Sequence, residues 1–177
     1  LGSFMMFKNH FGNSVAALGE NLLVGVPDSD YQGVIDSGCV YLMSPESAWP
    51  ILALTAESIG AGPADADQFG FQVAAAGNNI LVSAPGRAVD GVEAAGAVYL
   101  FDTQGNLLQT FENPSPGEGD RFGMAIAVVD DSVLIGAPYH DETGAVDAGA
   151  AYLFPLDPTG SNPYPSPVAT FSNPDAG

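Results

Sequence analysis

Two short loops of the sequence combine a central glycine with carboxylates on both sides. Their acidic side chains are Asp28, Asp30 and Asp36 in the first loop, and Asp141, Glu142 and Asp147 in the second. Ca²⁺ takes six to eight oxygen ligands, and glycine lets a chain bend sharply enough to gather them. The two loops are therefore candidate calcium sites. The competing interpretation is that these aspartates cap turns by accepting hydrogen bonds from nearby backbone N–H groups.

Catalysis by a nucleophile or a transition metal finds little support. His10 and His140 are the only histidines, and neither has a second histidine at ligand spacing. No serine lies in a Gly-x-Ser-x-Gly segment, and Cys39 falls inside an apolar, strand-like run. Two of the 21 acidic residues could still meet in space as a glycosidase pair. We expect that the chain is not an enzyme.

The composition indicates a packed, turn-rich protein of strong negative charge. The 177 residues include 22 Gly and 14 Pro, yet 46% are hydrophobic, which favours an all-β fold over disorder. The net charge of −18 repels nucleic acid and anionic membrane surfaces. No apolar run is long enough to span a membrane, so we expect neither nucleic-acid binding nor membrane insertion. The single cysteine, Cys39, is expected as a reduced core residue.

One pattern of landmark residues occurs three times along the chain. Each copy begins with Phe-Gly, at 11–12, 69–70 and 122–123, and continues at constant distances with Pro, Gly, Gly and Tyr. These landmarks are Pro27, Gly33, Gly38 and Tyr41, then Pro85, Gly91, Gly96 and Tyr99, and finally Pro138, Gly144, Gly149 and Tyr152. Self-similarity at such a period predicts a repeat architecture.

Each copy contains four apolar runs that are too short for helices. In the second copy these runs are 69–74, 80–84, 97–101 and 107–111, and turn residues separate them. Four antiparallel strands in about 50 residues describe one blade of a β-propeller. The sequence therefore predicts an all-β fold of three four-stranded antiparallel blades, over residues 11–66, 67–119 and 120–177.

Two kinds of repeated residue are predicted to hold the blades in place. Tyr41, Tyr99 and Tyr152 occupy matched strand positions and are expected to pack between blades. Asp67 and Asp120 each precede a Phe-Gly pair by two residues and are expected to accept backbone N–H bonds there. The first run of each copy is rich in small residues, which suits the crowded innermost strand of a propeller.

The segment FGFQVAAAGNNILVSAP, with GAVYLF after it, resembles the FG-GAP repeat of integrin alpha chains and of bacterial surface and secreted proteins. The third copy carries the literal Gly-Ala-Pro at 136–138, and the resemblance covers about residues 11–172. The resemblance implies a β-propeller with a binding or adhesion role, and no enzymatic activity.

The resemblance also implies calcium binding, because integrin-type repeats bind it in the loop between these strands through Asp-x-Asp-x-Asp-Gly-x-x-Asp. The loop from Asp28 to Asp36 retains three of the four acids and has Gln32 in place of the third. The loop of the third copy also keeps three acids, whereas the second copy has Ala88 and Ala94 at the key places. We therefore expect any calcium in the first and third copies.

The ends of the chain carry expectations of their own. Residues 1–3 resemble the remnant of a cleaved tag, and residues 4–9 resemble the outer strand of a preceding blade, so we separate segment 1–10 from the blades. The sequence stops where a fourth Phe-Gly would follow, as a piece of a longer protein would. Three blades do not close a ring, because propellers use four or more. FG-GAP propellers are similar to seven-bladed rings, so the chain is expected either to be a slice of a larger propeller or to pair with another copy. The open faces of the end blades are expected to self-associate, and a symmetric dimer of six blades is one closed solution.

These observations favour a non-enzymatic binding or adhesion module, extracellular or at the surface of a bacterial cell, that recognises a protein or a glycan and is stabilised by calcium. Two alternatives stay open. One is a partial propeller that closes a ring by oligomerisation, and the other is a hydrolase with its active site on a propeller face.

Overall fold

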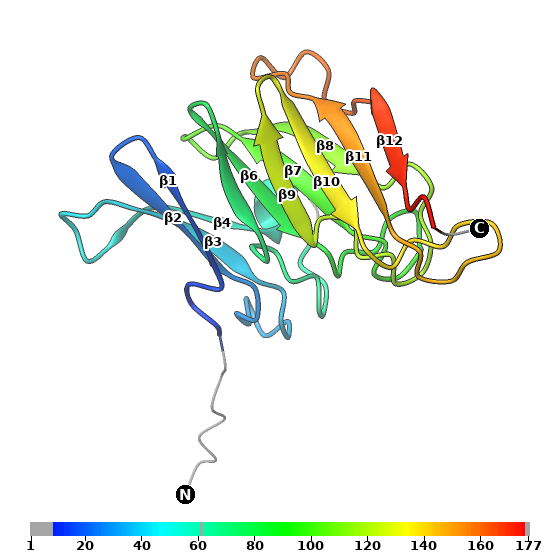
Figure 1. Ribbon diagram of the computed structural model, residues 1–177. Helices are drawn as coiled ribbons and strands as arrows, with labels where there is room; N and C mark the ends of the chain where they lie inside the picture. Colours follow the sequence, from blue (N-terminus) through cyan, green and yellow to red (C-terminus); the bar gives the residue numbers. More distant parts are fainter. Residues whose placement is uncertain (1–8, 61, 176–177) are drawn as a thin grey trace, which may run out of the picture.

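Twelve strands in the described part of the chain form three antiparallel sheets, one for each copy of the repeat. The structure is a computed structural model that describes residues 9–60 and 62–175, so the tag remnant and most of the preceding strand expected at 1–8 lie outside it. The strands are β1 (Ser14–Leu18), β2 (Asn21–Val26), β3 (Cys39–Met43) and β4 (Pro50–Thr55), then β5 (Val73–Ala76), β6 (Asn79–Ala84), β7 (Ala97–Phe101) and β8 (Leu107–Glu112), and finally β9 (Ala125–Val129), β10 (Ser132–Ala137), β11 (Ala150–Pro155) and β12 (Ala169–Ser172). Each sheet pairs its strands in chain order, and Figure 1 shows the three sheets side by side. The sheets are referred to below as blades 1, 2 and 3.

One turn of 3-10 helix, η1 (Ala56–Ile59), follows the last strand of blade 1. Thr55 caps its start, since the Thr55 side chain accepts a hydrogen bond from Glu57 N and Ser58 Oγ accepts one from Thr55 N. Among the described residues, no helix has the length and apolar character needed to cross a membrane.

The strands follow the apolar runs of the sequence except at the start of each blade. We predicted that the first strand of the second copy begins at Phe69, but β5 begins at Val73. Gly70 instead lies in a turn and has a φ of +91°, a left-handed conformation that glycine adopts without strain. The Phe-Gly landmark therefore marks a turn ahead of the first strand. The first strands themselves meet, with β1 against β5 and β5 against β9, as expected for the innermost strands of blades.

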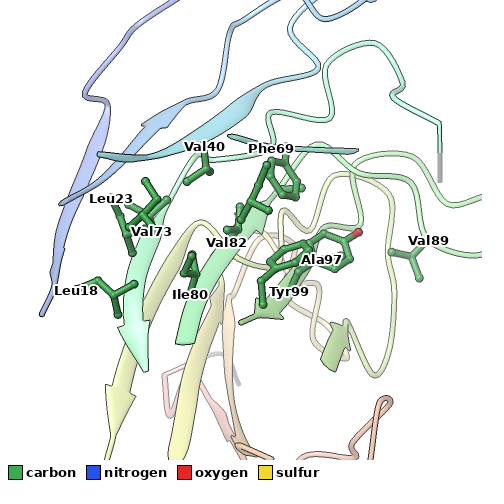
Figure 2. Packing of buried hydrophobic residues seen from close by; sticks show 14 of the residues in the cluster. Leu18, Leu23, Val40, Phe69, Val73, Ile80, Val82, Val89, Ala97 and Tyr99 are labelled. Atoms are coloured by element: carbon green, nitrogen blue, oxygen red, sulfur yellow. The ribbon is translucent and has the colours of Figure 1, made fainter. Parts of the chain in front are cut away.

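Blade 2 is buried on both of its faces. All five residues of β7 are buried, whereas burial alternates along β10 and β11 of blade 3. The cluster between blades 1 and 2 includes Leu18, Leu23, Val40, Phe69, Val73, Ile80, Val82 and Tyr99 (Figure 2). The cluster between blades 2 and 3 includes Leu81, Val98, Leu100, Phe111, Phe122, Val133, Ile135 and Tyr152. Because successive strand residues point to opposite faces, alternate residues of blade 2 serve both clusters, as in stacked propeller blades.

An aromatic pair joins the start of every blade to its third strand. Tyr99 and Tyr152 are buried, which confirms that they pack between blades, and burial raises the pKa of Tyr152 to about 12. Tyr41 of blade 1 is only half-buried. The pairs are Phe11–Tyr41, Phe69–Tyr99 and Phe122–Tyr152, with ring centroids 6.3, 6.0 and 5.8 Å apart.

Backbone hydrogen bonds join each blade to the start of the next one. Gln68 N donates to Asp36 O over 3.0 Å, and Phe69 N donates to Ser37 O over 3.1 Å. The same bonds recur one blade later, from Arg121 N to Ala94 O and from Phe122 N to Ala95 O. At this joint the two backbones are so close that a Cβ on Gly38 would lie 2.1 Å from Phe69 O. A side chain at Gly38 would therefore force the two blades apart.

Gly38→Ala is expected to destabilise the protein far more than Gly33→Ala. Both glycines have left-handed φ values, +81° and +85°, so both substitutions carry a backbone strain of about 1–2 kcal/mol. Gly38 also faces the neighbouring backbone, whereas no atom of the described residues lies within 4 Å of a Cβ on Gly33. We expect a total loss of about 3 kcal/mol or more for Gly38→Ala, measured by urea unfolding. Equal losses of unfolding free energy in the two variants would contradict the close backbone contact at Gly38.

A buried carboxylate anchors the base of the loop in blades 2 and 3. Asp67 Oδ2 accepts a hydrogen bond from Ala64 N at 3.0 Å and one from Arg87 Nη1 at 2.7 Å. Asp120 repeats the arrangement with a backbone N–H and with His140 Nδ1 at 3.0 Å. The expectation that these aspartates accept backbone N–H bonds is confirmed. Their basic partners in the loops were not expected.

Arg87→Met should leave the Asp67 carboxylate buried without its cation. Asp67 is 2% exposed, so we expect unfolding free energy to fall by about 3 kcal/mol, the scale for breaking a buried pair. Arg121→Met is the matched control, because among the described residues Arg121 Nη1 donates to the neutral Gln68 Oε1, at 3.3 Å, and to no carboxylate. Thermal and urea unfolding of both variants test this, and a similar loss for both would show that the charge of Asp67 is not what Arg87 balances.

Candidate functional site

Three equivalent loops connect the second strand of each blade to the third. They span residues 28–37, 86–95 and 139–148, and they leave the same edge of their sheets because they join equivalent strands. Figure 1 shows them on the side of the molecule opposite the β1–β2 and β9–β10 turns. Loops on one edge of a rigid scaffold are the usual place for a binding site.

The three loops share one backbone conformation. Each contains a small antiparallel bridge, between Tyr31 and Val34, Val89 and Val92, or Glu142 and Ala145. Each also has a left-handed residue near its end, with φ of 51° at Asp36, 50° at Ala94 and 53° at Asp147. Aspartate tolerates this conformation better than most residues. Since Ala94 adopts it as well, the fold imposes the conformation and the aspartates suit it.

In the loop of blade 1 the three predicted ligands lie near one another. Asp30 Oδ1 accepts a hydrogen bond from Asp36 N at 3.0 Å, and Asp28 contacts His10 Nδ1 and accepts from Gln68 Nε2 at 3.3 Å. Burial raises the pKa of the Asp36 carboxyl, and the negative charges of Asp28 and Asp30 raise it further. These carboxylates therefore repel one another when ionised.

In the loop of blade 3 the predicted ligands face different partners. Asp141 Oδ1 accepts a hydrogen bond from Asp147 N at 2.8 Å, which repeats the Asp30–Asp36 contact of blade 1. Glu142 instead accepts a hydrogen bond from Ser172 Oγ on the last strand. One aspartate in each acidic loop is thus a turn cap, as the competing interpretation expected.

The acidic loops offer oxygen donors but not an assembled metal cage. Within residues 9–60 and 62–175, no three His, Cys, Asp or Glu side chains are placed together to hold a metal ion. Calcium binding by these loops stays a prediction. Sequence reasoning missed Asp65, whose Oδ1 accepts a hydrogen bond from Ile35 N at 3.0 Å and whose charge also raises the pKa of Asp36. The signal was present, because Glu118 stands at the same place before the third Phe-Gly.

Apolar and aromatic side chains stand exposed on the same loops. Ile35 and Val146 occupy equivalent positions in blades 1 and 3, and both are exposed, as is Tyr139. Tyr31 and Gln32 are held in place by Glu57, which accepts a hydrogen bond from each of their side chains. The three loops therefore offer apolar contacts beside carboxylates.

The comparison with protein families agrees with this architecture. The family model described as FG-GAP repeat matches residues 58–101 and 115–154. These segments hold β5 to β7 of blade 2 and most of β9 to β11 of blade 3. A search of curated proteins found none that matches the chain. The two matched segments are FG-GAP repeats, and the first copy has the same landmark residues and the same four-stranded sheet, so the chain is built of FG-GAP-type repeats folded as β-propeller blades.

Proposed function

We propose that this chain is a non-enzymatic recognition module that binds a protein or a glycan through the loops at 28–37, 86–95 and 139–148. The observation that carries the proposal is the combination of one repeated loop backbone with different exposed side chains in each copy. A loop backbone that is held by the same bridge in every copy lowers the cost of ordering the loop on binding. A bacterial extracellular or cell-surface location accords with the net charge of −18 and with the resemblance to adhesion proteins.

In this proposal the two histidines have structural roles. His10 contacts Asp28, and His140 contacts Asp120 through Nδ1. Among the residues that the structure describes, neither ring has a serine or cysteine hydrogen-bonded to its other nitrogen, the arrangement that activates a nucleophile. His140 and Asp120 are accounted for as a structural pair at the base of a loop.

Substitution of the exposed loop side chains should abolish ligand binding. The protein would be screened on a glycan array and against a displayed peptide library, and each ligand found would be tested with Ile35→Ser, Tyr139→Ser and Val146→Ser combined. These side chains are exposed, so the variant should melt within about 1–2 °C of the wild type. Trp49→Ser, an exposed aromatic in the β3–β4 turn, is the control. No ligand in either screen, or full binding by the triple variant, overturns the proposal.

Calcium belongs to the proposal as a stabiliser of the acidic loops, and blade 1 offers the better case. Asp28, Asp30 and Asp36 lie near one another at the loop, and Asp36 has a raised pKa because of burial and these neighbours. A divalent cation would relieve their repulsion, provided that the side chains turn to share it. Blade 2 has Ala88 and Ala94 at the equivalent positions, so its loop is not expected to bind calcium.

Asp36→Asn should stabilise the calcium-free protein slightly and remove its response to calcium. A raised pKa means that Asp36 stabilises the fold when protonated, below its ordinary pKa of 3.8, and loses this contribution as pH rises through the folded-state pKa. At neutral pH the neutral amide therefore removes repulsion, by no more than about 0.5 kcal/mol at this accessible site.

The measurement is thermal melting with chelator and with millimolar calcium. At 100 times the dissociation constant, calcium adds about 2.7 kcal/mol to the wild type, a shift of roughly 5–10 °C. Asp131→Asn, in the β9–β10 turn, should keep that shift. If millimolar calcium does not raise the melting temperature of the wild type, the proposed calcium site is wrong. The recognition role is then still tested by the ligand-binding experiment.

A further inference from the structure

The Phe-Gly pair of blades 2 and 3 fills a groove on the blade before it. Gly70 lies so close to blade 1 that a Cβ on Gly25 would be 2.1 Å from Gly70 O. Phe69 beside it is 1% exposed, and Phe122 at the next joint is 0% exposed. The Phe-Gly pair is thus the part of each blade that is locked into its neighbour.

Phe11 and Gly12 of blade 1 have the same conformation without such a neighbour among the described residues. Gly12 has a φ of +86° and its N–H donates to Gly25 O at 3.1 Å, as Gly123 N donates to Gly136 O at 3.0 Å in blade 3. Phe11 keeps its contact with the tyrosine of its own blade, yet it is 63% exposed. No described atom lies within 4 Å of a Cβ on Gly12. We call this preformed projection the Phe11-Gly12 knob.

Blade 3 carries a groove at the place where blades 1 and 2 receive a Phe-Gly pair. The groove has a volume of about 660 Å³ and opens to solvent. Its lining includes Gly136, Ala137, Pro138, Gly149, Ala150 and Ala151. The equivalent residues of blade 1 run from Gly25 to Pro27 and from Gly38 to Val40. Among them, Gly25, Cys39 and Val40 lie against Gly70, and Gly38 lies against Phe69. We call this the blade 3 groove, and its shape is the one that a Phe-Gly pair fits.

The surfaces around the knob and the groove match as well. Val15 and Leu22 are exposed on blade 1, while their equivalents Val73 and Ile80 are buried against a preceding blade. Phe171 is likewise exposed on the outer face of blade 3, although its equivalent in blade 2, Phe111, is fully buried. The backbone groups match too, since the N–H groups of residues 10 and 11 correspond to those that bond the preceding loop at residues 68 and 69. The corresponding carbonyls of blade 3 are those of residues 147 and 148.

We propose that the Phe11-Gly12 knob of one copy of this chain inserts into the blade 3 groove of a second copy, and that the reverse contact between the same two copies closes a six-bladed ring. The occupant is a second copy because the two complementary surfaces lie on one chain, and the blade 1–2 and blade 2–3 interfaces show twice how they fit. Six blades lie within the range of closed propellers. The inference does not depend on the ligand proposed above.

The charge of the chain opposes this association and sets its salt dependence. Each copy carries −18, so two copies repel each other at low ionic strength. The contact surfaces are apolar. Added salt therefore screens the repulsion between the two copies without weakening the apolar contact between them. Dimerisation is therefore expected to strengthen from low to moderate NaCl concentration, the opposite of an interface held by ion pairs.

The test is sedimentation equilibrium of the wild type and of two variants that each remove one half of the contact. Phe11→Ser removes the knob, and the side chain is exposed in the single chain. Gly136→Val fills the groove and is compatible with the strand, because the nearest described atom to a Cβ there is Ala125 Cβ, at an ordinary 3.6 Å. The wild type should sediment at twice the monomer mass. Each variant alone should dimerise at least roughly 100-fold more weakly, the loss of a central contact residue.

Mixing the two variants separates this contact from any other. Phe11→Ser keeps a groove and Gly136→Val keeps a knob, so their equimolar mixture should form a heterodimer through one intact contact. Tyr164→Ser is the control, an exposed aromatic beside β8 of the middle blade that should dimerise like the wild type. A wild type that stays monomeric, a mixture that does not associate, or a mass that grows beyond two copies overturns the proposed ring. Thermal melts of each variant verify that the fold is retained.

Discussion

The contact of two backbones at each blade joint is the constraint on which the rest of the structure depends. A Cβ on Gly38 would lie 2.1 Å from Phe69 O, and a Cβ on Gly96 would lie 2.1 Å from Phe122 O. This approach sets the spacing at which the apolar faces meet, and it brings the end of each loop within hydrogen-bond distance of the next blade. The left-handed residue that closes each loop does not depend on the joint, since Asp147 adopts it in blade 3, where no described blade follows, and Ala94 adopts it without a carboxylate to favour it.

The number, type and order of the strands can be predicted from the sequence because one pattern of landmarks and apolar runs occurs three times. The sequence places the first strand too early, at Phe69, because an apolar aromatic followed by glycine has the composition of a strand start, and periodicity carries no information on a left-handed glycine. The Arg87–Asp67 pair lies 20 residues apart in the chain and no periodicity connects its members. Comparison of the copies contained a signal, since His140 stands at the place of Arg87 in the copy where Asp120 stands at the place of Asp67.

The loops that form the candidate site follow from the same alignment, but the direction of their side chains does not. Asp30 and Asp141 have the residue type and spacing of metal ligands, and each accepts a backbone N–H from the residue six positions later. A carboxylate can bind a metal or cap a turn on the same backbone conformation, so sequence spacing alone does not distinguish a metal ligand from a turn cap. Asp65 contributes to this cluster from the segment that connects blade 1 to blade 2, and only the folded joint brings it to the loop of blade 1.

Repeat proteins usually end in repeats whose outer face is polar, because an inner face left open to water is poorly soluble. Neither end of this stack has such a face, since Val15 and Leu22 are exposed at one end and Val129 and Phe171 at the other. The charges of the chain lie mainly in turns and loops, so they do not make these faces polar. The residue types of blades 1 and 3 are those of an interior blade, and Phe11 is already packed on Tyr41 as its buried equivalents are packed on theirs. Both end faces therefore have the chemistry of blade interfaces. Burial of their apolar side chains would stabilise a contact with any second blade surface that meets them.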